Sequence, residues 1–377
     1  FFANARIRKL REKVRQLHNV AIGIVVFTAR GVRHRCLRLW RPRYYSLKNL
    51  EEDASMKTKL YAGTVGWGVW GSDDLGETWD FAFKGIYAEN RIWALCSHDL
   101  EPGIVLAGSD RGLLRQAADG AAEHVPSPAD ENGRCVWSVA QAPHDSNIIL
   151  IGTNPGALFR SDDGGKSWRE LPVDLVDSCP FIGKPRVTRI RFDPLETDAI
   201  WVSVEIDAVH RSRDGGDTWE KLDNGFKFPD IHDIAVINDG GRRKLLAATA
   251  VGLYQSLDDG ASWEWKKLDS PWQYTRGIKP RADLDGTVFL CNGDGPPGSQ
   301  GRLLRSRDWG ESWEDANLPG QTNSTPWMVA THPANPSLLF TCTNLGQMYR
   351  SNDGGEVWQR LPREFGEIRT LLWHPAA

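Results

Sequence analysis

Apolar residues gather along most of the chain in short runs that are separated by Gly, Pro and Asp. One stretch shows the pattern clearly, with successive runs at 136–141, 148–153, 157–160 and 168–171. Short runs bounded by turn-forming residues are typical of β-strands. The pattern therefore predicts a chain built from units of four short strands each.

Six segments share the spacing Ser-x-Asp-x-Gly-x-x-Trp, and their tryptophans lie 89, 51, 44, 50 and 45 residues apart. The segments are 72–79, 161–168, 212–219, 256–263, 306–313 and 351–358. An Asp carboxylate accepts backbone N–H bonds in a tight turn, and Gly permits positive φ there. Because strand-like residues flank each copy, we interpret the motif as a hairpin between two outer strands. The long first spacing predicts a degenerate seventh copy at 115–122, where Asp119 and Gly120 persist and the tryptophan is lost.

Four strands per unit of ~45 residues is typical of a β-propeller blade. The repeated motif resembles the BNR or Asp-box repeat family, which includes sialidases, sortilin-type propellers, xyloglucanases and photosystem assembly factors. The resemblance covers 56–377 and implies an all-β, seven-bladed β-propeller, whereas sialidases typically have six blades. The segment 367–375 looks like the start of a blade, and the first unit lacks its own first strand. We therefore expect the C-terminal strand to complete blade 1 and close the ring, which removes exposed sheet edges.

The family architecture implies that the Ser and Asp of the motif are structural. Ligands are expected where the innermost strands start and the second strands end. Aligning the units places at the inner-strand starts Arg369, Trp93, Trp137, Thr188, His232, Arg276 and Trp327. The ends of the second strands carry Val65, Asp110, Asn154, Glu205, Ala250, Gly293 and Asn344.

Arginine and tryptophan dominate the first of these two rings. Guanidinium forks bind carboxylates or phosphates, and indole faces stack on sugars, aromatic rings or cations. The predicted ligand-binding residues are Arg276, Arg369, Trp93, Trp137, Trp327, Asp110, Asn154 and Asn344. On the opposite arc, His232 and Glu205 are the candidate catalytic residues, as acid and base. Alternatively, Arg276 and Arg369 pair with Asp110, Glu205 or Asp294, and the tryptophans only pack between blades.

Sialidase chemistry fits this sequence poorly. That family uses three arginines, a Tyr–Glu nucleophile pair and an acidic Asp, whereas two arginines fall in this ring and Arg189 is displaced by one position. Tyr274 lies near the ring, where Glu205 is its candidate partner. A xyloglucanase-like site would need two carboxylates from two propellers. No HxH or HExxH spacing and no glycine-rich phosphate loop occur, so neither a metal nor a cofactor is predicted.

Composition adds two constraints. The chain is 40% hydrophobic and 25% charged, which is typical of a soluble globular protein. Residues 1–55 contain 13 Lys and Arg against 4 Asp and Glu, whereas the rest contains 33 and 45. An acidic body argues against nucleic acid as a ligand. Six scattered cysteines without a CxxC pair favour free thiols in a reducing, cytoplasmic setting.

The basic segment 1–55 is interpreted as an extension separate from the propeller at 56–377. The first methionine is Met56, so a mistaken start is one explanation of the extension. A targeting segment and a basic interaction arm are the alternatives. The apolar run at 20–27 is too short to span a bilayer. No membrane association is predicted for 56–377.

Two functions remain open from the sequence. In the first, a glycosyl-hydrolase-like propeller binds or turns over a small anionic or carbohydrate-like ligand at the channel mouth, as a hydrolase or lyase. In the second, the propeller is a non-catalytic scaffold for a protein partner. Loss of ligand binding on removal of the ring arginines would favour the first.

Overall fold

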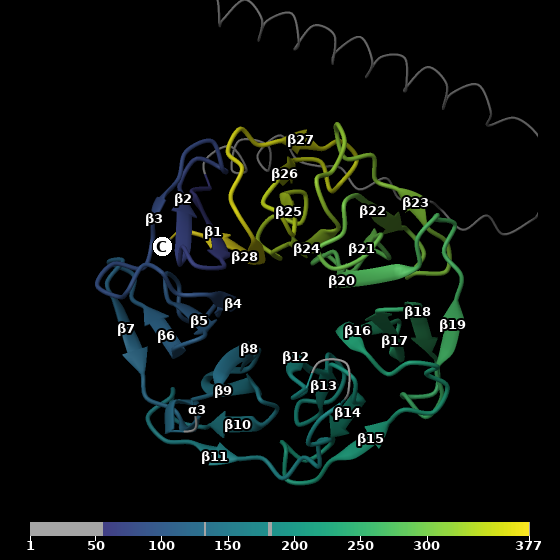
Figure 1. The fold of residues 1–377 in the computed structure, drawn as a ribbon, viewed down its shortest axis with the longest axis horizontal. Coiled ribbons are helices and arrows are strands. Elements are labelled where there is room, and N and C mark those ends of the chain that lie inside the picture. The colour runs from purple at the N-terminus through teal and green to yellow at the C-terminus, as the bar shows by residue number, and fades with distance from the viewer. Residues whose placement is uncertain (1–55, 132, 180–182, 377) are drawn as a thin grey trace, which may run out of the picture. The chain divides into compact units, whose positions relative to one another are not determined.

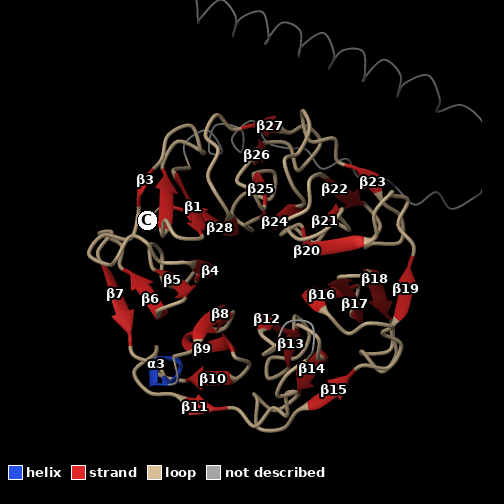
Figure 2. Ribbon diagram, viewed as in Figure 1, coloured by secondary structure: helices blue, strands red, loops and turns tan. Residues whose placement is uncertain are grey.

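The predicted strands form seven antiparallel four-stranded sheets, arranged as blades around a central axis (Figure 1). The computed structural model describes residues 56–131, 133–179 and 183–376. Figure 2 shows that strands dominate this part of the chain and that its one helix is the short α3, Pro128–Glu131. The prediction of a seven-bladed β-propeller is confirmed.

Blades 2 to 7 each follow chain order from the axis outward. Blade 2 holds β4 (Ile92–Ser97), β5 (Val105–Ser109), β6 (Gly112–Gln116) and β7 (Ala122–Val125), and blade 3 holds β8 (Cys135–Ala142), β9 (Asp145–Asn154), β10 (Leu158–Ser161) and β11 (Arg169–Glu170). Blade 4 holds β12 (Val187–Phe192), β13 (Ile200–Val204), β14 (Ala208–Ser212) and β15 (Glu220–Leu222), and blade 5 holds β16 (Ile231–Asp239), β17 (Arg242–Thr249), β18 (Gly252–Ser256) and β19 (Glu264–Lys266). Blade 6 holds β20 (Tyr274–Pro280), β21 (Val288–Gly293), β22 (Gly301–Ser306) and β23 (Glu314–Asp315), and blade 7 holds β24 (Pro326–Ala330), β25 (Leu339–Thr343), β26 (Met348–Ser351) and β27 (Gln359–Arg360).

Blade 1 combines the two ends of the propeller. Its outer strands are β1 (Thr58–Thr64), β2 (Val69–Ser72) and β3 (Asp80–Phe81), and its innermost strand is β28 (Ile368–Pro375). The β28 strand pairs antiparallel with β1 from Thr58↔Pro375 to Thr64↔Ile368. The predicted closure of the ring by the C-terminal strand is therefore confirmed.

The hydrophobic core is divided among the faces between blades. Seven clusters of buried residues occur in the described part, and each combines residues of two neighbouring blades. The cluster between blades 7 and 1 contains Trp373 and Leu371 of β28 together with Phe340 of β25. Burial of apolar surface between twisted sheets is the main stabilising term for such a ring.

The repeated motif forms a compact turn at the outer edge of a blade. In blade 3, Ser161 Oγ accepts the Gly165 N–H at 2.8 Å and donates to Asp163 at 2.8 Å. Asp163 also accepts the Ser167 N–H at 2.9 Å and the Ser167 hydroxyl at 2.6 Å. The Trp168 indole N–H donates to the Gly165 carbonyl at 3.2 Å. Gly165 has φ of 90°, a conformation that favours glycine.

A hydroxyl residue directly before the tryptophan is part of the motif, although the sequence pattern left that position open. It donates to the motif carboxylate in five of the six copies, through Thr78, Ser167, Thr218, Ser262 and Ser312. Blade 7 has Val357 there, so Asp353 accepts only N–H groups on that side of the turn.

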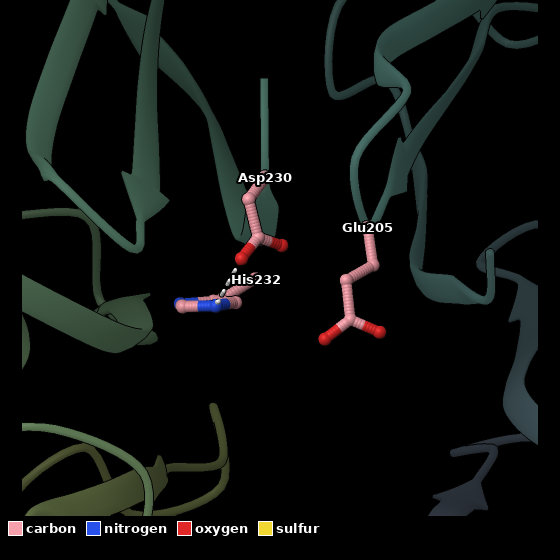
Figure 3. A group of neighbouring side chains, drawn as sticks. All are labelled: Glu205, Asp230 and His232. Atoms are coloured by element: carbon pink, nitrogen blue, oxygen red, sulfur yellow. Dashed lines mark ion pairs between the residues drawn. The ribbon is translucent and has the colours of Figure 1, made fainter. Parts of the chain in front are cut away.

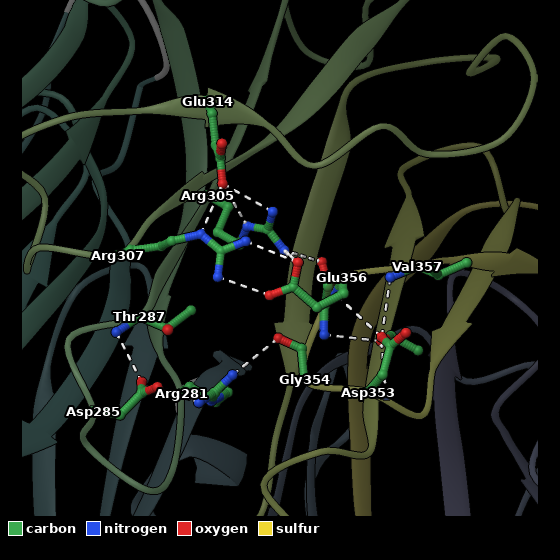
Figure 4. Close-up of polar contacts among 12 residues, drawn as sticks. Arg281, Asp285, Thr287, Arg305, Arg307, Glu314, Asp353, Gly354, Glu356 and Val357 are labelled. Atoms are coloured by element: carbon green, nitrogen blue, oxygen red, sulfur yellow. Dashed lines mark hydrogen bonds and ion pairs between the residues drawn. The ribbon is translucent and has the colours of Figure 1, made fainter. Parts of the chain in front are cut away.

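Arginines before the motif serine connect neighbouring blades at the rim. Each donates to a carbonyl in the motif turn of the next blade, from Arg160, Arg211, Arg305 and Arg350 at 2.5–3.1 Å. Figure 4 shows the bridge between blades 6 and 7, where Arg305 and Arg307 lie between Glu314 and Glu356. The rim is therefore joined by polar contacts as well as by the apolar clusters.

The degenerate copy lies between β6 and β7 of blade 2, as predicted, but its register differs. Arg115 occupies the place of the rim arginines, and Gln116 at the end of β6 occupies the place of the serine. The Gln116 amide donates to the Ala82 carbonyl of blade 1 at 2.8 Å. The turn is also shorter than in the other blades, because β7 starts at Ala122 directly after the Asp119–Gly120 turn.

The interpretations of residues 1–55 concern a segment outside the described residues. Within the described part, no helix is long and apolar enough to cross a bilayer. The five described cysteines are free thiols.

Candidate functional site

One residue near the start of every inner strand departs from regular pairing with the second strand. The register between the two strands shifts at this point in all seven blades, which marks a β-bulge. In blade 6 the shift spans two residues, Arg276 and Gly277. The first residue within each shift is, blade by blade, Trp93, Trp137, Thr188, His232, Arg276, Trp327 or Arg369. These are the seven residues that the sequence alignment places at the inner-strand starts. Bulges turn a side chain away from its regular direction and are common beside active sites.

The structure brings these seven side chains together at one mouth of the channel. They line a single pocket, to which Arg189 adds an eighth side chain. The volume of this pocket is about 20 Å³. A single water needs roughly 10–15 Å³ measured in this way, so the mouth is a constriction rather than a cavity for a whole ligand.

Arginine and tryptophan side chains form a continuous stacked series around half of the mouth. The guanidinium carbons of Arg276 and Arg369 lie 4.2 and 4.7 Å from the centroid of the Trp327 ring. Arg369 also lies 5.6 Å from the Trp93 centroid, and Trp93 stacks on Trp137 with centroids 4.2 Å apart. Such contacts hold the planar groups of the mouth in fixed positions.

Arg186 completes the series, with its guanidinium carbon 4.6 Å from the centroid of the Trp137 ring. Two of the arginines have carboxylate partners: Arg369 pairs with Glu367, and Arg186 pairs with Glu205. Burial, together with the neighbouring charge of Arg276, lowers the pKa of Arg369 to about 10. Arg276 makes no ion pair with a carboxylate in the described part of the chain, and its guanidinium stacks on the Trp327 ring. Arg276 is therefore the guanidinium at the mouth that is available for an added anion.

The opposite arc holds the predicted acid–base pair and a second carboxylate (Figure 3). His232 Nε2 lies 3.5 Å from Asp230 Oδ2, and His232 Nδ1 lies 2.6 Å from the Thr275 carbonyl oxygen. Burial opposes ionisation of Asp230, but the contact with His232 and the charges of Arg276 and Arg186 hold its pKa below the usual value. Both ring nitrogens of His232 are thus engaged, as is Glu205 through Arg186.

Glu205, Asp230 and His232 could also supply three ligand atoms to a cation. One such atom from each lies within 4.8 Å of the others, and all three residues are buried. Arg186 already neutralises Glu205, and the Arg276 charge acts on Asp230. Two guanidinium groups beside the carboxylates oppose the binding of a divalent cation.

The predicted residues at the ends of the second strands lie apart from this pocket. Asp110 follows β5 and accepts the Arg91 N–H at 3.0 Å. Asn154 ends β9, where it pairs with Cys135. Asn344 is buried, and its backbone N–H donates to the Thr325 carbonyl at 3.0 Å. None of the three lines the mouth pocket, because the second strand of each blade lies farther from the axis than the first. Arg276 and Arg369 do not pair with Asp110, Glu205 or Asp294 among the described residues.

Three residues of the mouth were not predicted from the sequence: Arg186, Asp230 and Glu367. Each directly precedes the first residue of an inner strand, namely Val187, Ile231 and Ile368. A charged residue at this position recurs at Arg91 before β4 and at Arg134 before β8. Extending the alignment of inner-strand starts by one residue toward the N-terminus would have revealed this recurrence.

Comparisons of the sequence with known proteins find xyloglucanases, Ycf48 assembly factors and, over a shorter stretch, vacuolar protein sorting/targeting protein 10. A profile of the family described as photosynthesis system II assembly factor YCF48 matches residues 131–279. The oligoxyloglucan-reducing end-specific xyloglucanase of Emericella nidulans is 24% identical over 327 residues, which cover 71% of this chain and 40% of the enzyme. The photosystem II assembly lipoprotein Ycf48 of Synechococcus sp. is 25% identical over 273 residues, which cover 68% of this chain and 71% of that protein. The chain thus spans less than half the length of the xyloglucanase that it matches.

Solved structures of both xyloglucanases and YCF48 are also similar in fold. The GH74 xyloglucanase from Xanthomonas campestris aligns with a TM-score of 0.54 at 20% identity, covering 81% of this chain and 47% of the enzyme. A structure of YCF48 bound to D1 peptide aligns with a TM-score of 0.53 at 16% identity, covering 76% of this chain and 93% of that one. At these identities the similarity concerns the fold.

The closed ring with a bulged residue at every inner-strand start defines a β-propeller with one polar, aromatic channel mouth. The repeats and the sequence matches show that the chain is a propeller of the BNR-repeat type, related both to xyloglucanases and to Ycf48 assembly factors.

Proposed function

We propose that this propeller is a binding protein whose channel mouth holds a carboxylate group of a peptide segment from a protein partner. The observation that carries the proposal is the position of Arg276, a guanidinium fixed on Trp327 and without a carboxylate partner in the described part. A guanidinium held in place in this way binds a carboxylate with little loss of side-chain entropy.

The size of the mouth favours one small group over a sugar ring. About 20 Å³ admits a carboxylate that replaces a water, whereas the rest of the ligand would lie on the surface around it. Peptides bind in this manner when a single charged group enters a recess and the backbone lies across the rim.

The tryptophans of the mouth are poor platforms for a sugar. Trp137 and Trp327 are only 9% and 4% exposed. Two guanidiniums contact the Trp327 ring, and Trp137 is stacked on Trp93. Stacking of a sugar requires an open indole face, so these contacts support a structural role for the indoles in positioning the arginines.

The candidate acid and base are also committed to protein contacts. Glu205 pairs with Arg186, and His232 lies between Asp230 and the Thr275 carbonyl. A general acid or base must reach the reacting group of the substrate. This arrangement supports binding rather than turnover. The peptide-bound YCF48 structure, a relative in fold, supports a peptide as the ligand class.

Titration of the full chain with short acidic peptides tests this function. Tryptophan fluorescence follows binding at the mouth, and each peptide is compared with a form in which its carboxylates are amidated. Arg276→Gln should weaken binding at least tenfold, since a hydrogen bond to a charged group contributes about 1.5–3 kcal/mol. Arg242→Gln is the control, because the Arg242 side chain is 85% exposed and lies outside the mouth pocket.

Three outcomes would contradict the proposal. Equal binding of the acidic and the amidated peptides would exclude carboxylate recognition. Equal loss in Arg276→Gln and Arg242→Gln would place the peptide elsewhere. Binding or cleavage of neutral oligosaccharides, without peptide binding, would favour a carbohydrate ligand instead.

A further inference from the structure

The channel widens beyond the mouth into a second, larger cavity. This cavity has a volume of about 130 Å³, and its charged lining residues are Arg189, Arg191, Lys279 and Asp233. The remaining lining is mostly apolar, with Ala94 and Leu372 as examples. Three cations therefore share a confined space with one carboxylate.

The cations reach this cavity because strand geometry and the order of the blades direct their side chains to the axis. Arg189 and Arg191 are two residues apart on β12, the inner strand of blade 4, so both side chains point to the same face. Lys279 lies near the end of β20, the inner strand of blade 6, and Asp233 follows the bulged His232 on β16 between them. All four residues face the axis from three consecutive inner strands.

Asp233 is already fully engaged by the protein. Its side chain is buried, and Oδ1 accepts Arg191 Nη2 at 2.8 Å and the Ile234 N–H at 2.9 Å. Oδ2 accepts the Ile278 N–H at 3.3 Å and lies 3.5 Å from Arg189 Nε. One carboxylate thus balances the charge of one arginine, and two positive charges remain.

The Lys279 ammonium has no hydrogen-bond acceptor or ion-pair partner among the described residues. The groups that face it are Arg189, Arg191, Asp233 and the Cys96 thiol of β4. Burial and the charge of Arg191 lower the pKa of Lys279 to about 8, so it is mostly protonated at neutral pH. Uncompensated charge in a confined space is costly, and a bound counterion removes that cost.

We propose that this inner cavity binds a small inorganic anion of the size of chloride, held by Arg189, Arg191 and Lys279. The cavity is several times larger than the roughly 10–15 Å³ that one water needs, so an anion and a few waters fit together. The site lies behind the mouth and shares only Arg189 with it, so its main test uses Lys279, which does not line the mouth pocket. One such anion would reduce the excess positive charge of the cavity from two to one and stabilise the folded protein.

Chloride itself is the probe for this site. The thermal unfolding midpoint of the full chain is measured at pH 7 in sodium chloride and in sodium gluconate, a larger organic anion, at equal ionic strength. Chloride should raise the midpoint by about 2–4 °C for each tenfold increase above its dissociation constant. Because binding requires protonated Lys279, the chloride effect should decline as pH rises through about 8.

Lys279→Met removes the cation that lacks a partner and should abolish the chloride effect without lowering the midpoint in gluconate. Lys267→Met, at an exposed lysine, is the matched control and should keep the effect. Crystals soaked in bromide should show anomalous density beside Lys279. The same chloride dependence in wild type and Lys279→Met, including none, would overturn the proposal, as would bromide absent from the cavity. Loss of the effect in Arg276→Gln would also overturn it, by moving the anion to the mouth.

Discussion

The rim and the mouth of this propeller are formed by the same sheets, but the amino-acid sequence repeats at the rim and varies at the mouth. At the rim, six turns use nearly the same residues in the same hydrogen bonds, such as Ser161 to Asp163 and Ser212 to Asp214. At the mouth, seven bulges share one backbone feature but carry four different residue types, Trp, Arg, Thr and His. At the rim, repeated side chains thus stabilise the fold. At the mouth, a repeated backbone bulge positions side chains that differ from blade to blade.

This difference indicates where a role beyond folding can reside. A rim residue has its partner within its own turn or in the next blade, so the folded structure accounts for it. Arg276 at the mouth and Lys279 behind it have no such carboxylate partner in the described part. The following experiments test how sharp this division is, from the largest expected effect to the smallest.

Acidification should destabilise the rim before the rest of the propeller. Hydrogen bonds from Ser167 and Thr218 lower the pKa of Asp163 and Asp214 to about 2. An unfolded Asp has a pKa of about 3.9, so the unfolded chain takes up protons first. Stability that is present above pH ~4 should be lost as pH falls toward 2. Urea unfolding at a series of pH values measures this loss. Asp163→Asn should reduce the slope, and an unchanged midpoint down to pH 2 would contradict the prediction.

Trp373→Ala tests whether the inner strands are also structural away from the mouth. Trp373 is buried in the cluster between blades 7 and 1, so its loss should lower the free energy of unfolding by about 3–5 kcal/mol. Arg369→Gln on the same strand should change that free energy by less than ~1 kcal/mol, since the Arg369 and Glu367 side chains are 22% and 30% exposed and water can replace part of their ion pair. Urea unfolding measures both variants. Equal losses of unfolding free energy would mean that the mouth residues stabilise the fold as much as the buried clusters do.

Ser161→Ala tests the repeated turn. Its hydroxyl accepts the buried Gly165 N–H, and removal should cost about 1–3 kcal/mol by leaving that donor unsatisfied. Gln116→Ala in the degenerate turn should cost less, about 0.5–1.5 kcal/mol, because only the hydrogen bond from the Gln116 amide to the Ala82 carbonyl, at 2.8 Å, has a typical length, whereas that to the Gly120 carbonyl is 3.5 Å long. A larger loss at Gln116 than at Ser161 would show that the degenerate turn has taken over a special role in the joint between blades 1 and 2.

The smallest effect is expected at the exposed bridge between blades 6 and 7. Arg307 and Glu356 are 53% and 46% exposed, although their two hydrogen bonds are 2.7 and 2.8 Å long. A double-mutant cycle with Arg307→Gln and Glu356→Gln should give a coupling energy of only ~0.2–1 kcal/mol. A coupling above this range at moderate salt would show that rim ion pairs hold the blades together.

The sequence was sufficient for the fold because the repeated motif is local. Its Ser, Asp, Gly and Trp lie within eight residues, so spacing alone reveals the turn, the blade and the count. The inner-strand positions followed from alignment of those units. The ion pairs of Arg186 with Glu205 and of Arg369 with Glu367 could not be predicted from that alignment. Which carboxylate an arginine pairs with depends on the direction in which each side chain points near the bulge. The convergence of Arg189, Arg191 and Lys279 was also missed, since it depends on inner strands of separate blades meeting at the axis.

The pairing of β28 with β1 has a consequence for motion. An open array of repeats has terminal units that contact one neighbour and fray first. In this ring every blade has two neighbours, and the apolar clusters are continuous around the circle. Partial opening anywhere must therefore break two interblade faces at once. Amide hydrogens of all seven inner strands should therefore report one common free energy of opening, equal to that of global unfolding, once their intrinsic exchange rates are taken into account.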